Sequence, residues 1–350
     1  MSRRTESAPT LATVAAEAGV SRQTVSNALN SPELLRPDTL ERVQAAIERL
    51  GYSPNRAARS LRTRSSHLIG LRVEPAVEDS ANALMDRFVH SLVDSTKGAG
   101  YHVLLFSGDV KPDGAEDDPL AGYDELLRSA AVDAFVVTDT YRGNPQAAWL
   151  ARQGVPFVAF GRPWAEPAAV HPWVDVDGRA GVVLAVDHLV GLGHTRIAWV
   201  GWKKDSFIGE DRRSGWTDRM HEHGLSTSRL SARGDDHLDL GRRAAHALLD
   251  SEQPSAFVCV SDTVAMGVLR ALAERHLTAG RDIAVVGFDD SIAAQVCTPG
   301  LTSVRQPLEQ VAVEVVRHLG DLLGHRPITD PGKMLTPTLS VRASSGATTG

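Results

Sequence analysis

Three polar side chains near the start of the chain have the types and spacing needed to read base pairs. Arg22, Gln23 and Asn27 follow a Gly-Val-Ser turn, and at roughly 100° per helical residue they share a sector of about 140°. Arginine can bond guanine O6 and N7 together, and glutamine or asparagine can do the same with adenine N6 and N7. We therefore predict that these side chains contact base edges in the major groove of double-stranded DNA.

Short hydroxyl-bearing residues are interspersed with these three side chains. Ser21, Thr24 and Ser26 are small enough to let a helix backbone approach phosphate oxygens. We predict that they contact the DNA backbone. The alternative is that the whole face is the solvated surface of a small helical bundle.

Three short helices must position these side chains. Thr10 can cap the first helix and Gly19 can end it, Ser21 can cap the second, and a third runs from Pro37 to Gly51. The residues expected to face inward are Leu11, Val14, Ala15, Ala18, Val25, Ala28, Leu29, Leu40, Val43, Ile47 and Leu50. This pattern predicts an all-α helix-turn-helix head over residues 10–53, behind a flexible tail over residues 1–9.

An arginine-rich segment follows the head. The stretch YSPNRAARSLRTRSS places four arginines around one large apolar side chain, Leu61. Such a segment is too small to bury a core alone, but it can fold against DNA and insert its apolar residue into the minor groove. We predict a hinge helix over residues 54–66 in which Leu61 wedges between base steps and Asn55 and Arg59 contact the backbone. The alternative is an inert linker.

The charge of the chain is divided unevenly. The 350 residues have a net charge of −6, yet residues 1–66 carry a net +4 and the remainder −10. A basic head before an acidic body is expected when one end of a protein meets an anionic polymer.

Composition also narrows the class of protein. No stretch approaches the roughly 18 consecutive apolar residues of a membrane helix, the start lacks the apolar core of a secretory signal, and the two cysteines have no CxxC spacing. We expect a soluble protein of the cytoplasm, with no membrane partner, no metal and no other cofactor.

From His67 onward, buried strands alternate with amphipathic helical stretches. Strand-like runs include HLIGLRV, YHVLLFS, VDAFVVT, RIAWVG and IAVVGFDD. Continuous apolar strands joined by helices predict an α/β body of parallel sheets covered on both faces. We predict that this body spans residues 67–342 and has two lobes, because Pro and Trp interrupt the alternation near residues 161–177. The expected lobes are residues 67–173 with 306–332 and residues 174–305 with 333–342, followed by a tail over residues 343–350.

Polar side chains follow several of the predicted strands, where ligands of open α/β sheets bind. They are Arg162, Trp164, Arg212, Arg213, Ser261, Asp262, Asp289 and Asp290. Guanidinium and carboxylate groups near indole rings suit a polyhydroxylated ligand held between two lobes. The alternatives are that Ser261 or Asp262 only caps the next helix, and that one of the two adjacent aspartates is structural.

The stretches TLATVAAEAGVSRQTVSNALN and YSPNRAARSLRTRSSHLIGL together resemble the head and hinge of the lactose/galactose repressor family of bacterial transcription regulators. The resemblance continues to about Arg342 and implies a periplasmic-binding-protein-like body. It also implies that Arg22, Gln23 and Asn27 read bases and that Leu61 enters the minor groove. The family usually has Arg where this chain has Asn27, so the operator half-site can differ from the common one.

The resemblance further implies a homodimer, or a higher oligomer, on a pseudo-palindromic operator and a repressor of genes for sugar uptake or catabolism. The effector-binding residues that it implies are Arg212, Asp289, Ser261 and Gln306, with Glu74, Asp236, Arg162 and Trp164 as weaker candidates. A regulator that responds to a non-sugar ligand or to a corepressor stays open.

Catalytic and metal-binding interpretations have little support in the sequence. GLGHTR lacks the third glycine of a dinucleotide fingerprint, and no Walker loop, HExxH or GxSxG occurs. HEH at residues 221–223 and DDH at residues 235–237 fit an exposed helix end and a loop. A periplasmic sugar-binding protein would share the body but not the head. We therefore expect a regulator and not an enzyme.

Overall fold

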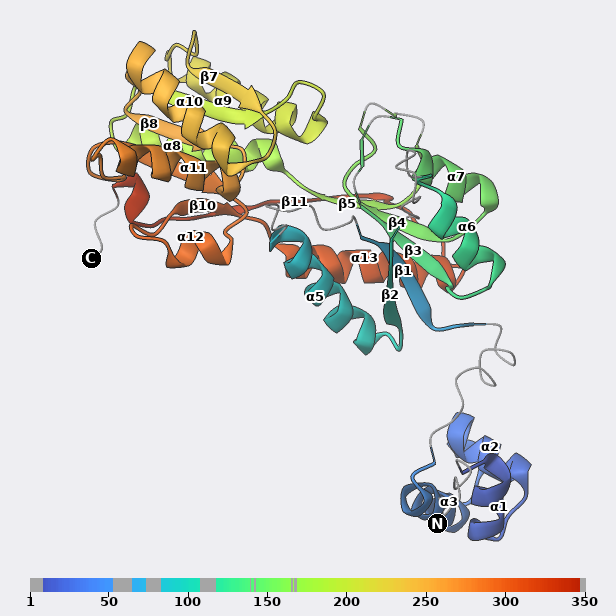
Figure 1. The fold of residues 1–350 in the computed structure, drawn as a ribbon. Coiled ribbons are helices and arrows are strands. Elements are labelled where there is room, and N and C mark those ends of the chain that lie inside the picture. Colours follow the sequence, from blue (N-terminus) through green and yellow to red (C-terminus); the bar gives the residue numbers. More distant parts are fainter. Residues whose placement is uncertain are drawn as a thin grey trace, which may run out of the picture. The chain divides into compact units, whose positions relative to one another are not determined.

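The chain divides into two compact units, Met1–Ser66 and His67–Gly350, which Figure 1 shows as ribbons. The computed structural model describes residues 9–52, 65–73, 83–107, 118–138, 140–141, 143–164, 166 and 169–346. The division falls at the position where the predicted body begins. We refer to the two units as the head and the body.

The described residues of the head form three α-helices around a small core. The helices are α1 (Leu11–Ala18), α2 (Arg22–Asn30) and α3 (Pro37–Leu50), with a 3-10 turn, η1 (Pro32–Leu34), before the last. The core comprises Val14, Ala15, Ala18, Val25, Val43 and Ala46, with Leu11, Val20, Ala28, Leu29, Ile47, Leu50 and Tyr52 packed against it. The periodicity therefore predicts the inward faces correctly, apart from Leu40, which lies outside this cluster.

The ends of these helices follow from their capping residues. Thr10 Oγ1 accepts a hydrogen bond from the amide three residues on, at 3.3 Å, and Ser21 Oγ does the same at 3.1 Å. Gly19 and Gly51 end α1 and α3 with φ values of 62° and 58°, a conformation that glycine adopts without strain. The predicted starts of the first two helices are confirmed.

The first lobe of the body contains a six-stranded parallel sheet in the order β11-β5-β4-β3-β1-β2. Its strands are β1 (Leu68–Arg72), β2 (His102–Phe106), β3 (Ala134–Val137), β4 (Phe157–Phe160), β5 (Trp173–Val176) and β11 (Gly332–Leu335). Its helices are α5 (Ala83–Gly98), α6 (Ala121–Arg128), α7 (Pro145–Gln153) and α13 (Leu308–Leu323). Helices α5 and α13 share one core cluster with the sheet, and α6 and α7 share another, so both faces are covered.

The second lobe contains a six-stranded sheet in the order β12-β10-β9-β8-β6-β7. Its strands are β6 (Ile197–Trp202), β7 (Ser231–Gly234), β8 (Ala256–Cys259), β9 (Ala284–Phe288), β10 (Thr302–Arg305) and β12 (Thr338–Ser340). Its helices are α8 (Gly178–Gly191), α9 (Phe207–Glu222), α10 (Leu238–Ser251), α11 (Asp262–Glu274) and α12 (Ile292–Val296). Only the pairing of β12 with β10 is antiparallel among the described strands. The two-lobed α/β prediction is confirmed.

The chain crosses between the lobes later than predicted. Strands β5 and β11 pair with each other in the first sheet, from Trp173 opposite Gly332 to Val176 opposite Leu335. The predicted boundaries after residues 173 and 332 would divide both strands, and they are wrong by a few residues. The reason is that each strand continues directly into the crossover. The predicted interruption over residues 161–177 contains β5 itself, and the chain crosses at the end of this range.

The prediction of a tail after Arg342 is also wrong for its first residues. A 3-10 turn, η2 (Ala343–Ser345), packs into the second lobe with Ser344 and Ser345 buried. Ser344 Oγ accepts from the Thr302 amide at 2.8 Å and donates to the Val285 carbonyl at 2.6 Å. These hydroxyls satisfy buried backbone groups, which a polar-looking sequence does not reveal.

Candidate functional site

Helix α2 carries the three predicted base-reading residues, and two of them, Gln23 and Asn27, are hydrogen-bonded to each other. Arg22 and Gln23 are exposed and Asn27 is half-buried. Gln23 Nε2 donates to Asn27 Oδ1 at 2.9 Å, so the two amides act as one paired unit. The remaining amide atoms, Gln23 Oε1 and Asn27 Nδ2, still offer an acceptor and a donor to a base edge.

Residues with hydroxyl side chains at the start and within α2 form hydrogen bonds inside the helix and at its N-terminal cap. Ser21 Oγ lies 2.9 Å from Thr24 Oγ1, and the Ser26 carbonyl accepts from Asn30 Nδ2 at 2.5 Å. Ser21 therefore has a capping role in addition to any contact with phosphate. Three further predicted DNA-contacting residues, Asn55, Arg59 and Leu61, lie outside the described residues.

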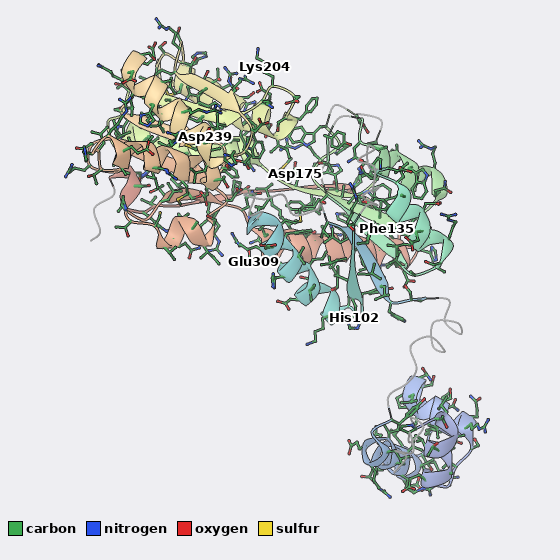
Figure 2. All side chains as sticks on the ribbon, viewed as in Figure 1. His102, Phe135, Asp175, Lys204, Asp239 and Glu309 are labelled. Atoms are coloured by element: carbon green, nitrogen blue, oxygen red, sulfur yellow. The ribbon has the colours of Figure 1, made fainter. Side chains whose placement is uncertain are left out.

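A cavity of about 120 Å³ lies between the two lobes of the body. The first lobe contributes Met85, Thr138, Thr140, Arg162, Trp164 and Asp175, and the second lobe contributes Gly178, Ile208, Asp211 and Arg212. Figure 2 shows Asp175 in the region between the lobes. Of the predicted effector-binding residues, Arg162, Trp164, Arg212 and Gln306 line this cavity.

Arg212 on α9 is the buried cation of the cavity, with only 5% of its surface exposed. Its Nη1 donates to the Val260 carbonyl at 2.7 Å, and its guanidinium carbon lies 3.6 Å from the centre of the Phe288 ring. Burial lowers the pKa of Arg212, and the carboxylates of Asp289, Asp236, Asp175 and Asp211 oppose that shift. These carboxylates partly offset the cost of burying the guanidinium charge.

Asp289 follows β9 and faces this arginine. Its Oδ1 lies 4.0 Å from Arg212 Nη2 and accepts from Gln306 Nε2 at 2.7 Å. Burial raises the pKa of Asp289 to about 7, although Arg212 opposes the shift. The residue also has a φ of 108°, a strained value for a side chain other than glycine. Arg212, Asp289 and Gln306 thus form one hydrogen-bonded and ion-paired group.

Ser261 has both roles that the sequence left open. Its hydroxyl caps α11 by accepting from the Val264 amide at 3.2 Å, and it donates to Asp236 Oδ1 at 2.5 Å. Asp236 is exposed, so this contact links a buried cap to the surface. Neither residue is among those that line the cavity.

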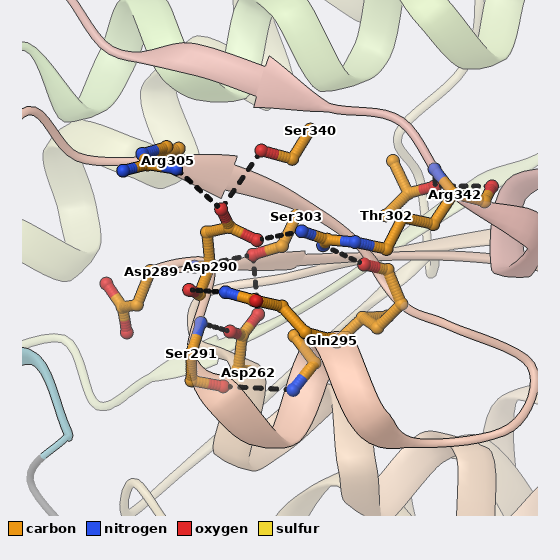
Figure 3. Close-up of polar contacts among 12 residues, drawn as sticks. Asp262, Asp289, Asp290, Ser291, Gln295, Thr302, Ser303, Arg305, Ser340 and Arg342 are labelled. Atoms are coloured by element: carbon orange, nitrogen blue, oxygen red, sulfur yellow. Dashed lines mark hydrogen bonds and ion pairs between the residues drawn. The ribbon is translucent and has the colours of Figure 1, made fainter.

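Asp290 and Asp262 form a structural cluster behind the site. Asp290 is buried and accepts from Arg342 Nη2 at 2.6 Å and from Ser340 Oγ at 3.1 Å. Asp262 accepts from the Ser291 amide at 2.7 Å and from the Ser303 hydroxyl on β10 at 2.6 Å. Figure 3 shows these contacts, with Asp289 turned away from them. The expectation that one of the adjacent aspartates is structural is confirmed, and that residue is Asp290.

A second cluster of charged side chains in the cavity, centred on Arg162, forms an ion pair between the lobes. Arg162 Nε donates to Asp175 Oδ2 at 2.6 Å in its own lobe, and Nη2 lies 3.4 Å from Asp211 Oδ2 in the other. The Arg162 guanidinium carbon is 4.2 Å from the centre of the Trp164 ring, and that ring is 6.3 Å from the Phe207 ring of the second lobe. Burial raises the pKa of Asp211, and Arg162 opposes this shift.

Sequence reasoning missed Asp175, Asp211 and Phe207. Asp175 alternates with valines in the strand WVDV, and Asp211 directly precedes Arg212. The signal that could have found Asp175 is a carboxylate inside an otherwise apolar strand. Of the weaker predicted candidates, Glu74 lies outside the described residues.

Other chemistries find no support in the part of the chain that the structure describes. Among those residues there is no group of three or more His, Cys, Asp or Glu that could hold a metal ion. In the HEH stretch, His223 Nε2 lies 2.8 Å from Asp187 Oδ1. None of the described helices has the length and apolar character needed to span a bilayer.

Comparison with known proteins matches both units. Residues 10–55 match the family of bacterial regulatory proteins, lacI family, and residues 186–345 match the periplasmic binding protein-like domain. The transcriptional regulator CelR of Thermobifida fusca is 34% identical over 343 residues, which cover 96% of this chain and 98% of CelR. The regulator MalR of Streptomyces coelicolor is 33% identical, covering 97% of each chain.

Two solved structures show the same architecture. A complex of the transcriptional regulator CelR with cellobiose has 31% identity and a TM-score of 0.71, covering 96% of this chain and 99% of that one. A lac repressor dimer bound to operator and an anti-inducer has 25% identity and a TM-score of 0.79, covering 97% and 100%. With a matching head, a matching body and relatives similar over almost their whole length, this chain belongs to the lacI family of bacterial regulatory proteins.

Proposed function

We propose that this regulator represses genes for the uptake or breakdown of a sugar and that a small ligand between its lobes changes its affinity for an operator. The observation that carries the proposal is the exposed polar face of α2, where Arg22 and the Gln23–Asn27 pair are free to meet base edges. Ser21, Thr24, Ser26, Asn55 and Arg59 are proposed to contact the DNA backbone, and Leu61 to enter the minor groove.

The ligand is proposed to be a sugar held by Arg212, Asp289 and Gln306. Their guanidinium, carboxylate and amide groups can form paired hydrogen bonds with adjacent hydroxyls, and Trp164 offers a ring face to sugar C–H groups. The related CelR has been solved with cellobiose. Ser261, Asp236, Arg162 and Glu74 are weaker candidates for the same role.

The regulator is proposed to act as a homodimer in the cytoplasm. A single DNA-binding module covers only about 600–1,000 Å² of surface, so two heads on a pseudo-palindrome supply the specificity that one lacks. The related lac repressor was solved as a dimer on its operator. A sedimentation mass equal to one chain at micromolar concentration would contradict the dimer.

The coupling between ligand and DNA is proposed to run through the lobes. A ligand that favours one arrangement of the lobes would change the spacing of the two hinges in a dimer, and so their ability to fold on DNA. We propose release of the operator by the ligand, with corepression as the opposite sign. No turnover of the ligand is proposed, and the relatives are regulators and not enzymes.

DNA footprinting tests this function directly. The purified protein is incubated with the region upstream of its own and neighbouring genes, with and without a panel of sugars. Protection of a pseudo-palindrome that one sugar abolishes is the expected result. Protection that no sugar changes would remove the effector assignment, and no protection at all would contradict the DNA-binding role.

A further inference from the structure

Carboxylates outnumber cations around the cavity between the lobes. Arg162 and Arg212 are the guanidinium groups among its described lining residues. The carboxylates that act on them electrostatically or line the cavity are Asp175, Asp211, Asp236 and Asp289. Asp177 adds a further negative charge next to Asp211. Among the described residues, Asp175, Asp177, Asp211 and Asp236 outnumber the two arginines even when Asp289 holds its proton, so the site has a negative surplus.

Both guanidinium groups are already committed to protein acceptors. Arg162 holds Asp175 at 2.6 Å and approaches Asp211 at 3.4 Å. Arg212 uses Nη1 for the Val260 carbonyl at 2.7 Å and directs Nη2 toward Asp289 at 4.0 Å. An anionic ligand would have to displace a carboxylate or lie beside it, and like charges at such distances repel strongly where water is excluded.

The cavity nevertheless offers unused hydrogen-bond donors. Arg212 Nε, Trp164 Nε1 and the Thr140 hydroxyl are buried and have no hydrogen-bond partner among the described residues. Trp202 Nε1 is also buried without a hydrogen-bond partner among the described residues, and the Trp202 ring centre lies 5.3 Å from the Arg212 guanidinium carbon. Buried polar atoms are rarely left unpaired, so these positions point to a ligand that supplies acceptors.

A hydroxyl group satisfies both requirements at once, because it accepts from an N–H donor and donates to a carboxylate. We infer that the effector of this regulator is an uncharged polyhydroxylated sugar, and that Asp175 and Asp211 exclude phosphorylated and carboxylated sugars from the cleft. This inference rests on the proposed function and narrows its ligand class. It makes these two aspartates specificity determinants.

Matched pairs of sugars test the inference. Calorimetry on the full-length protein compares glucose, cellobiose, maltose and trehalose with their 6-phosphates, together with glucuronate. We expect an uncharged member to bind and its phosphate to bind at least 100-fold more weakly. A phosphate that binds as tightly as its parent sugar would overturn the inference. Absence of binding by every uncharged member would overturn it too.

Two variants sharpen the test by changing the selectivity. Asp175→Asn with Asp211→Asn leaves Arg162 without its carboxylate partners and should raise the affinity for the phosphate relative to its parent by at least 10-fold. Asp218→Asn is the control, because Asp218 lies on α9, as Asp211 does, but pairs with Arg179 at the surface. If the double variant does not fold, Asp211→Asn alone gives the same readout. An unchanged ratio would overturn the role of the aspartates.

Operator protection is scored in parallel, which separates this inference from the proposed function. Release of the operator by a phosphorylated sugar would refute the uncharged effector while leaving a sugar-responsive regulator intact. Loss of operator binding in the absence of any sugar would instead refute the proposed function.

Discussion

At the scale of single residues, the hydrogen bond between Gln23 and Asn27 makes the two side chains of α2 interdependent. Each amide orients the other at 2.9 Å, so the pair presents one acceptor and one donor in a defined direction. Removing either side chain leaves the other free to rotate. Under the proposed function, we therefore expect the base preference of α2 to depend on the pair and not on two independent contacts.

A double-mutant cycle on operator DNA measures that dependence. Asn27→Ala should weaken operator binding by about 1–3 kcal/mol, mainly at one base pair. Gln23→Ala should cost a similar amount, and the double variant less than the sum, because each single change already disrupts the pair. Gln44→Ala on the exposed side of α3 serves as the control. Strict additivity in gel-shift titrations, or an equal loss on all sequences, would contradict paired base reading.

The raised pKa of Asp289 predicts a pH dependence of stability. The folded protein holds this proton up to about pH 7, while an unfolded chain releases it near pH 4. The folded state thus binds more protons between these values, so this residue makes the free energy of unfolding fall as pH rises through the window. Burial is the main cause, Asp262 and Asp236 add to it, and Arg212 and Gln306 oppose it.

Asp289→Asn removes this titration while retaining the size and polarity of the side chain. Thermal unfolding from pH 5 to 8.5 should show the melting temperature of the variant gaining on that of the unmodified protein as pH rises to about 7, and then running parallel. A constant difference between the two proteins over the whole range would show that the carboxyl does not titrate there.

At the scale of elements, Asp290 connects strand β9 to the end of the chain. It ties Arg342, and through it the segment leading to η2, to β12 and β10. One buried carboxylate thus contacts both the antiparallel edge strand and the segment before the C-terminal turn. Its neighbour Asp289 instead contacts Gln306 and Arg212, so two adjacent identical residues serve different parts of the lobe.

Asp290→Ala should lower the free energy of unfolding by about 3 kcal/mol, because it removes one partner of a buried ion pair. Asp218→Ala removes a carboxylate from an exposed pair and should cost about 1 kcal/mol or less. Urea denaturation of the two variants gives the comparison. Equal losses would mean that the Asp290 cluster contributes no more than a surface pair.

At the scale of the whole molecule, the head and the body are separate compact units. We propose that the signal from the cleft reaches the DNA-binding helices through residues 53–66. Under the proposed function this segment folds on DNA and bends it. Since Leu61 is proposed to wedge between base steps, the DNA bend is the measurement that tests this residue most directly.

Leu61→Ala should reduce the DNA bend, because alanine is too small to hold two base steps apart. Gel mobility of circularly permuted operator fragments measures the bend angle. Leu34→Ala in the head is the control, since Leu34 is 70% exposed. A bend that Leu61→Ala leaves unchanged would show that the hinge does not intercalate.

Local patterns in the sequence predicted the features that depend on close neighbours along the chain. The caps at Thr10 and Ser21, the glycine that ends α1 and the inward face of α2 involve residues at most four apart. The alternation of strands and helices likewise predicted the two-lobed α/β body. Arg212 and Asp289 were predicted as ligand contacts from their places near strand ends and were favoured by the resemblance, whereas Gln306 was predicted from the resemblance alone.

Only the tertiary structure decided which distant residues meet. The residue pattern could not choose between Asp289 and Asp290, and only the resemblance favoured Asp289, because the structural partner Arg342 lies 52 residues beyond Asp290. It could not pair Arg162 with Asp211, 49 residues apart and in the other lobe. Nor could it assign β11 to the first sheet, since β11 pairs with β5, a strand far away in the sequence, after the chain has crossed back between the lobes. Such contacts form only when separate elements pack, and no local pattern encodes their partners.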